Sequence, residues 1–593
     1  MSIASMMMSS LHVTASSAPS LHPKTFYSSR NASRRPTTCI RSSGDKSGEE
    51  FPLIKLDRRN MLIGIGGGLY GTTLGLGHDQ KAAADPVGPP DLSSCHAARD
   101  LDTTNTTDYA CCPPYTFPLP NPESIPSYKI PKNPILRKRK AIQMMTPDEL
   151  YKFESAIAEM KKLDKTDPNN PWSFTQQAQI HCAYCNNAYY QYKTDKVPLE
   201  IHFSSLFLPW HRWYIYFFER ILGKLIGDDS VALPYWNYDN PDGMAFPKAY
   251  DNPNSPLYDD LRNKGHAYAR NYVDLNYGGE PYTPPPQKQL IDENLCYLQT
   301  IFNQGEVDPL QFIGCPIAAG VQWGYQYAGL LESLHNSVHQ WTGPIASPNF
   351  DMGNFISAAR DPIFYAHHSN VDRLWDIFRN CFLKTELETT STDWLDASFV
   401  FYDENKELVK VNVKDSLRID NLGYSYTSMP LVWKDFSKAC KIRPKITCTA
   451  TAVEFGSVPK ALVSDPIRVL VKRPNSSRSK SEIQNTLEVV MVDGIEVEHT
   501  SSTRFDVFIN TPSDNSTHLG DFVGSFTTVA HGHKHGETSD GNEKKLGLKL
   551  GITSMVSKLN AEDAESLVVS LVPRMGPVVV GGVRIEQIEK KTA

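Results

Sequence analysis

Six histidines in two groups constrain the fold of this chain of 593 residues more than any other feature. They occur among Trp and Phe in helix-like sequence: His181, His202 and His211, followed by His335, His339 and His368. In HNSVH the spacing of His335 and His339 places both imidazoles on one face of a helix. Burying so many imidazoles would be costly unless they bound something. The two groups therefore predict a metal site.

The choice of metal follows from the donor atoms. A di-iron bundle needs Glu-x-x-His on two helices, and only Glu332 to His335 offers that pattern in helical sequence. A catalytic zinc uses three protein ligands at one open site, so two groups of three histidines exceed its needs. A pair of all-imidazole sites suits copper. We expect two copper ions that face each other and catalyse oxidation by O2.

The N-terminal segment has the composition of a targeting signal. No acidic residue precedes Asp45, and a twin arginine at Arg58 and Arg59 is followed by a glycine-rich apolar stretch and by Ala82-x-Ala84. This order predicts that residues 1–84 are a plastid transit peptide plus a twin-arginine signal for the thylakoid lumen. The apolar run is shorter than the ~20 residues that cross a bilayer. We expect no transmembrane segment, although peripheral association with the thylakoid membrane is compatible with this location.

The rest of the chain divides into three predicted parts. Residues 85–440 form the first domain: an N-terminal arm rich in Pro and polar residues from Asp85 to about Pro131, helical patterns from Thr146, and short alternating runs that predict strands after about Asp393. Residues 441–482 resemble a linker rich in Ser, Lys and Pro, and alternating runs in residues 483–593 predict further strands. The fold class is therefore a multidomain α+β protein. It has a mainly α catalytic domain, built as a four-helix bundle around the metals, and a C-terminal β-sandwich domain.

Charge excludes one class of partner and leaves two local clusters to explain. The formal net charge is -6, so the chain offers no basic surplus for binding nucleic acid. The basic run from Arg137 to Lys140 is predicted to be a solvated face. The histidines of HGHKHG (His531, His533 and His535) could bind a stray metal, but a solvated loop is the favoured interpretation.

Several motifs resemble one family. HCAYC, FLPWHRWY, HNSVH and DPIFYAHHSNVDRLW resemble the type-3 dinuclear copper proteins, in particular the plant polyphenol oxidases, which include catechol oxidase and tyrosinase. The resemblance continues through Asp393-Trp394-Leu395, the Tyr424-Ser-Tyr426 motif and RFDV from Arg504. It covers nearly all of the chain after the targeting segment.

The resemblance implies a ligand set and several covalent links. The first copper would be held by His181, His202 and His211, and the second by His335, His339 and His368, with His367 as a neighbour. A thioether would join Cys185 to His202, and its alternative is an inert buried thiol. The implied disulfides are Cys95–Cys112 and Cys111–Cys182.

Three further residues acquire roles from the same resemblance. Phe355 would be a gate above the second copper; its alternative role is core packing. Glu332 and Asn336 would hold a water that deprotonates a phenol. Many plant members have one more residue between this glutamate and the next ligand, so a solvated or salt-bridged helix glutamate remains the alternative for Glu332.

The implied function is the oxidation of o-diphenols to o-quinones with reduction of O2 to water. The partners would be small phenols, with no nucleic acid, and the C-terminal domain would shield the site until an activating protease or a detergent-like trigger displaces it. A monophenol hydroxylase, of tyrosinase type or in a specialised biosynthetic pathway, is the alternative. An O2 carrier of haemocyanin type fits less well, because a carrier does not explain the plastid signal.

Overall fold

The computed structural model describes residues 85–99, 108–115, 118–132, 134–321, 326–344, 350–383, 392–436, 451–498, 501–512, 519–531 and 545–590. The predicted targeting segment 1–84, part of the predicted linker, His533 and His535 lie outside these residues. None of the described helices is long and apolar enough to cross a membrane.

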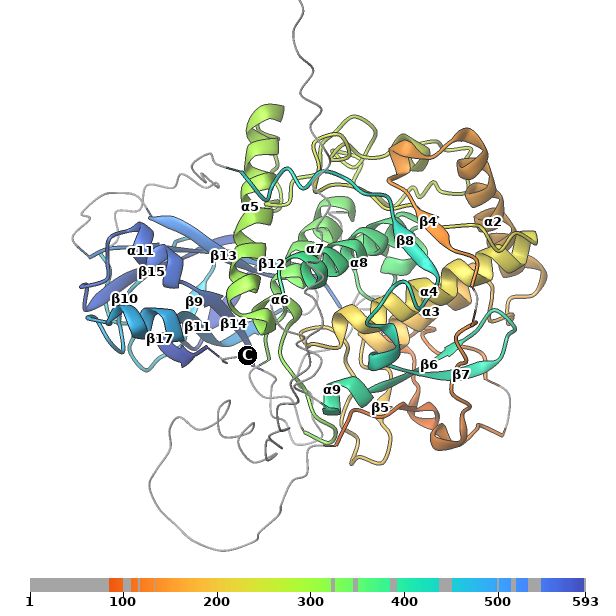
Figure 1. Ribbon diagram of the computed structural model, residues 1–593, viewed down its shortest axis with the longest axis horizontal. Coiled ribbons are helices and arrows are strands. Elements are labelled where there is room, and N and C mark those ends of the chain that lie inside the picture. The colour runs from red at the N-terminus through yellow and green to blue at the C-terminus, as the bar shows by residue number, and fades with distance from the viewer. Residues whose placement is uncertain are drawn as a thin grey trace, which may run out of the picture. The chain divides into compact units, whose positions relative to one another are not determined.

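The helical part of the chain extends from α2 to α9 (Figure 1). Its helices are α2 (Pro147–Thr166), α3 (Phe174–Cys185), α4 (Phe207–Ile226), α5 (Gln287–Val307), α6 (Pro309–Ile313), α7 (Leu330–Thr342), α8 (Ile363–Cys381) and α9 (Thr392–Asp396). A capping box between Thr146 and Glu149 begins α2. Gly227, at φ 68°, ends α4 in the left-handed conformation that glycine adopts without strain. The bundle around the histidines consists of α3, α4, α7 and α8, as the sequence predicts.

Helix α4 is the centre of this bundle. Nearly all its residues are buried, including Trp210 and Trp213. The ring of Phe218 stacks on Tyr365 of α8 at a centroid distance of 3.5 Å. Aromatic packing on this scale makes the helix positions rigid.

The basic run before α2 is not a solvated face, so that prediction is wrong. Strand β4 (Arg137–Arg139) pairs in parallel with β8 (Tyr424–Tyr426), and the side chains of Arg137 and Arg139 are buried. Both donate to the carboxylate of Glu219 on α4, at 2.6 and 2.8 Å. Alternate residues of a strand point to opposite faces, so only Lys138 between them is exposed.

Short strand pairs complete the helical part, and two larger sheets form the C-terminal β domain. The short pairs are β1 (Pro90–Asp91) with β5 (Tyr190–Gln191), β2 (Ala98–Arg99) with β3 (Asp108–Tyr109), and β6 (Ser398–Tyr402) with β7 (Leu408–Asn412). One larger sheet has the order β10 (Ile467–Lys472), β15 (Ser566–Met575), β12 (Thr503–Asn510), β13 (Asp521–Thr528). The other has the order β14 (Leu546–Gly551), β11 (Thr486–Val497), β16 (Val578–Val580), β9 (Lys460–Leu462), with β17 (Gly582–Glu589) beside β11. Two short helices, α10 (Lys480–Asn485) and α11 (Thr553–Lys558), flank these strands.

Strands β9 and β10 lie inside the stretch predicted to be a linker. They add to the two larger sheets by pairing with β16 and β15. Strand β10 spans only six residues, and its buried positions, Val469 and Val471, are covered only when β10 pairs with β15 and contacts β17 of the other sheet. A short alternation flanked by polar residues therefore resembles a linker until its partner strand is known.

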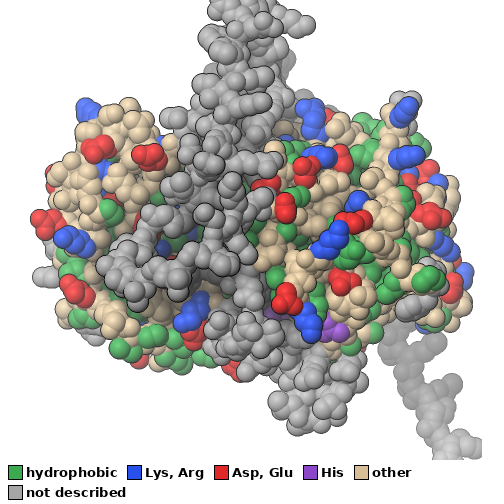
Figure 2. Space-filling view, turned by 90° about the horizontal axis from the view of Figure 1, so that it is seen from below, with side chains coloured by type: hydrophobic (Ala, Val, Ile, Leu, Met, Phe, Trp, Pro, Cys, Tyr) green, Lys and Arg blue, Asp and Glu red, His purple; other side chains and the backbone are tan. Residues whose placement is uncertain are grey.

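Disulfides attach the N-terminal arm to the bundle. Cys95 is bonded to Cys112, and Cys111 to Cys182 of α3. These are the pairs that the family resemblance implies. Cys296 and Cys381 are also disulfide-bonded, which the sequence patterns did not indicate. On the face shown in Figure 2, acidic and basic side chains of the described residues are interspersed.

Candidate metal centre

The first group of histidines converges from α3, α4 and the loop between them. His181 lies on α3, His202 precedes α4, and His211 lies on its second turn. Their candidate ligand atoms and the sulfur of Cys185 all lie within 4.8 Å of one another. The Nδ1–H groups of His181 and His211 donate to the carbonyls of Phe355, at 3.0 Å, and Phe207, at 2.8 Å. These bonds turn each Nε2 toward the centre of the group.

The second group comes from α7 and α8. His335, His339, His367 and His368 have candidate ligand atoms within 4.8 Å of one another. The Nε2 of His368 lies 3.1 Å from that of His335 and 3.4 Å from that of His339. His339 donates from Nδ1 to the carbonyl of Met352 at 2.8 Å. The convergence of three Nε2 atoms on one point favours His368 over its neighbour His367 as the third ligand.

The two groups are adjacent. The ring of His211 stacks on that of His368 with centroids 4.4 Å apart. The ring centroids of His202 and His335 are 6.1 Å apart. The bundle therefore brings together residues from both halves of the catalytic sequence. Two metal ions held by these groups would be neighbours.

The electrostatics of the site match ligands for a metal. Burial lowers the pKa of every histidine in the two groups, and lowers that of His202 and His339 to about 3. The imidazoles are therefore neutral, with lone pairs available. Within the described part of the chain, Nε2 of His181, His202 and His211 has no hydrogen-bond partner. Buried unpartnered nitrogens are costly unless they bind something, and an all-imidazole set fits copper.

Cys185 lies where the implied thioether needs it. It follows His181 by four residues on α3, its thiol is free in the structure, and burial raises the pKa of that thiol. Its sulfur is within 4.8 Å of the candidate ligand atom of His202. This proximity is compatible with the link.

Glu332 is neither solvated nor exposed. It is 1% exposed, and its Oε1 accepts a hydrogen bond from the backbone N–H of Phe203 at 2.8 Å. Burial raises the pKa of this carboxyl well above its usual range. Phe203 follows His202 and has φ 57°, so Glu332 ties α7 to the loop that presents a histidine of the first group.

Phe355 covers the first group of histidines in this structure. Its ring is parallel to that of His202 at a centroid distance of 4.0 Å, and its carbonyl accepts the bond from His181. The same residue therefore packs in the core and contacts the site, so the two alternatives for Phe355 are not exclusive. The resemblance placed it above the second copper, whereas its stacked neighbour is His202.

His531 is a site residue that the sequence analysis missed. It was expected in a solvated loop but is buried at 2% exposure, so that prediction is wrong. The N–H of Phe355 donates to the carbonyl of Ala530 at 3.0 Å, and the ring of His531 lies 6.2 Å from that of Phe355. The apolar residues that precede HGHKHG were the available signal, because they extend strand β13 toward the site.

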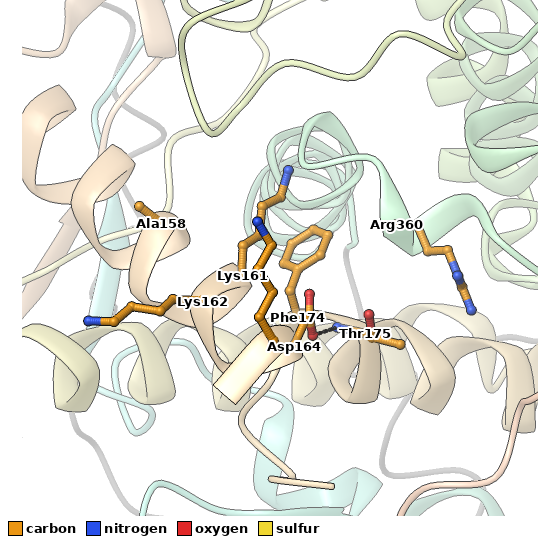
Figure 3. Close-up of a pocket in the computed structure, with 8 residues that line it drawn as sticks. Ala158, Lys161, Lys162, Asp164, Phe174, Thr175 and Arg360 are labelled. Carbon is orange, nitrogen blue, oxygen red and sulfur yellow. Dashed lines mark hydrogen bonds between the residues drawn. The ribbon is translucent and has the colours of Figure 1, made fainter. Parts of the chain in front are cut away.

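A separate cleft lies outside the metal centre. It has a volume of about 550 Å³ and lies between α2 and α3 (Figure 3). Its lining includes Lys161, Lys162, Lys165 and Arg360 around Phe174, and none of the clustered histidines. This cleft is therefore not the metal centre.

Comparison with known proteins agrees with this geometry. Residues 171–381 match the family described as the common central domain of tyrosinase. Residues 388–439 match the polyphenol oxidase middle domain, and residues 458–587 match the chloroplastic polyphenol oxidase C-terminal domain.

Individual relatives extend over most of the chain. The latent, chloroplastic polyphenol oxidase of Prunus armeniaca is 42% identical over 90% of this chain and 87% of its own length. The chloroplastic (+)-larreatricin hydroxylase of Larrea tridentata is 39% identical over 91% of this chain and 86% of its own length. The solved structure of latent apple tyrosinase superposes with a TM-score of 0.70 at 37% identity, covering 78% of this chain and 100% of that one. The cofactor is a pair of copper ions, and the chain belongs to the plant polyphenol oxidases, a family of oxidoreductases.

Proposed function

We propose that this protein oxidises o-diphenols to o-quinones while O2 is reduced to water. The observation that carries the proposal is the pair of adjacent imidazole groups, whose Nε2 atoms converge at two centres inside the bundle. The proposed ligands are His181, His202 and His211 at the first copper and His335, His339 and His368 at the second. Each diphenol loses two electrons and two protons, so two diphenols convert one O2 into two waters.

The copper ions would supply reversible redox chemistry and the Lewis acidity that lets a phenol bind as phenolate near neutral pH. The protein supplies ligand geometry and a dry site. Carbonyls of Phe207, Met352 and Phe355 orient three of the rings through their Nδ1–H groups. The proposed thioether from Cys185 would fix His202, which lies in a loop, and the ring of Phe355 would help to orient an aromatic substrate.

Hydroxylation of monophenols is the second candidate. The relative named (+)-larreatricin hydroxylase supports it, and so does the carboxyl of Glu332. Oε2 of that carboxyl is buried and has no hydrogen-bond partner among the described residues, which leaves it able to hold a water. Asn336 would share that water, although its amide is engaged by other groups in this structure.

We infer that the β domain keeps the enzyme latent. The Prunus armeniaca relative is named a latent form. In this chain, the segment ending at His531 covers Phe355. Displacing the segment would uncover the ring that lies on His202. An activating protease would act between Tyr426 and Lys480, and within that stretch ahead of β9, because β9 and β10 belong to the sheets of the β domain.

The proposed location is the plastid, since the relatives are named chloroplastic. Within the plastid, the twin arginine at Arg58 and Arg59 favours the thylakoid lumen. Import of the full chain into isolated chloroplasts, followed by fractionation with and without a transmembrane pH gradient, tests this. Import that stops in the stroma would contradict the lumenal assignment.

Oxygen uptake tests the function. Copper-loaded full-length protein, before and after limited proteolysis, is offered 4-methylcatechol or 4-methylphenol. We expect uptake with the diphenol that rises after proteolysis, and none with His368→Ala. Immediate uptake with the monophenol would favour the hydroxylase. Reversible O2 binding without turnover would identify a carrier, and absence of uptake with either phenol would refute the oxidase proposal.

A further inference from the structure

The β domain presents two open strand edges to the helical part. Strand β13 is one edge of the four-stranded sheet, and β14 is one edge of the other sheet. An edge strand exposes backbone groups that need partners. Here side-chain amides of the helices supply them on β13: Gln304 donates to the carbonyl of Val523 at 2.6 Å, and Gln340 to that of Thr528 at 2.8 Å.

Two neighbouring sides of helix α7 contact different parts of the protein: one faces the metal centre, and the next faces the β domain. His335 and His339 face the metal centre, whereas the next side of the helix carries Asn336, Ser337 and Gln340. The hydroxyl of Ser337 accepts a hydrogen bond from Arg504 of β12 at 2.9 Å. The β domain therefore forms hydrogen bonds to the helix that carries two proposed copper ligands, on a side away from those ligands.

Asn336 forms hydrogen bonds both to a proposed copper ligand and to the β domain. Its Oδ1 accepts from Nδ1–H of His335 at 3.0 Å, and its Nδ2 donates to the carbonyl of Thr527 in β13 at 2.8 Å. Both Asn336 and His335 are completely buried. An amide group is planar, so Asn336 cannot turn to improve one bond without moving the other.

We propose that Asn336 is a positioning residue that couples docking of strand β13 to the orientation of His335 at the second copper. The proposal rests on the proposed function only for the assignment of His335 as a ligand. The outer partner of a ligating histidine fixes its tautomer and ring orientation. Asn336 is that partner here, and its own orientation is fixed by a strand of the other domain.

Reciprocity makes the coupling measurable without turnover. If docking of β13 improves copper binding at His335, copper binding must stabilise the docking by the same factor. Gln340 offers a matched control, because it binds the next carbonyl of the same strand from the same helix but is not hydrogen-bonded to His335. Gln340→Ala weakens docking while leaving the amide link to His335 intact.

The experiment compares hydrogen exchange of β13 in the full-length chain with and without copper. In the wild type and in Gln340→Ala, we expect copper to slow exchange across Asp521–Thr528 several-fold. In Asn336→Ala, we expect the ratio between copper-free and copper-loaded protein to fall to about one. We also expect Asn336→Ala to bind copper 10- to 100-fold more weakly than Gln340→Ala in competition with a chelator, as is typical for loss of such a partner.

Asn336→Leu repeats the test without opening a cavity, since leucine fills a similar volume but forms neither bond. Protection of β13 by copper in either Asn336 variant at the wild-type level would overturn the coupling. Absence of protection in the wild type would also overturn it. A chain that binds copper but oxidises no phenol would refute the proposed function alone, because the exchange ratio does not depend on turnover.

Discussion

Gln304 provides a way to change latency without touching the metal centre. Its side chain extends from α5 to both open strand edges: Nε2 donates to the carbonyl of Val523 in β13 at 2.6 Å, and Oε1 accepts from the N–H of Gly551 in β14 at 3.2 Å. Gln304→Ala removes both bonds and retains a good helix former. The fold of the β domain itself is not altered, because the substituted residue belongs to the helical part.

The expected size of the effect follows from the bond to Val523. The N–H of Gly551 is shared between Oε1 of Gln304, at 3.2 Å, and Oε1 of Gln311, at 3.0 Å, so it stays bonded in Gln304→Ala. A buried hydrogen bond contributes about 1 kcal/mol net, so docking should weaken by about 1 kcal/mol. Since each 1.4 kcal/mol changes an equilibrium about tenfold, the undocked population should rise about fivefold. Gln311→Ala is the matched control. It removes only the other half of the shared bond and should raise that population less.

The assay measures oxygen uptake by the untrimmed, copper-loaded chain with 4-methylcatechol, together with hydrogen exchange in β13. If docking sets latency, uptake should rise in the order wild type, Gln311→Ala, Gln304→Ala, up to the rate of the proteolysed enzyme. Faster exchange with unchanged uptake would show that the β domain does not control access to the site. No change in either measurement would refute the contribution assigned to these amides.

Three further predictions concern single side chains. After reduction, a tryptic peptide containing Cys185 should stay joined to the His202 peptide, and separate peptides in the wild type would exclude the thioether. Phe355→Ala should raise kcat/KM for bulky diphenols several-fold relative to catechol, whereas an unchanged ratio would assign the ring to packing alone. Glu219→Gln leaves Arg137 buried without its counter-ion and leaves Arg139 with only the carboxylate of Asp372, at 3.4 Å, so urea unfolding at pH 7 should show a loss of about 3–5 kcal/mol. Burial alone would raise the pKa of Glu219, but Arg139 and Arg137 outweigh burial and lower that pKa below its ordinary 4.5. The ion pair therefore stabilises the fold fully above about pH 4.5, and this stabilisation decreases as pH falls through the folded-state pKa. A variant with wild-type stability at pH 7 and the same acid sensitivity would contradict this reasoning.

Much of the site could be predicted because its signals are local. The spacing of His335 and His339 defines one face of a helix, and helix-like sequence surrounds His181 and His211. These patterns indicated all six histidines, and the family resemblance then divided them into two ligand sets and indicated His368 rather than His367. The structure brings together the atoms that these short-range patterns indicated.

The mistaken predictions have a common physical cause. Arg137 and Arg139 have the composition of a solvated face, but a carboxylate eighty residues away in sequence makes their burial favourable. His531 lies in a polar, glycine-containing run, but packing against Phe355 excludes water from it. In both places the partner is distant in the chain, and local composition carries no information about a distant partner.

The sequence by itself determined the donor atoms, the helices that carry them, the order of the helical and β-rich parts and the family resemblance, because periodicity and motif spacing act over a few residues. Only the tertiary structure decided that His211 stacks on His368, that Glu332 holds the loop after His202, and that Asn336 joins a proposed ligand to strand β13. These contacts join segments from 129 to 191 residues apart in sequence. Their formation depends on how whole helices and sheets pack, which no local pattern encodes.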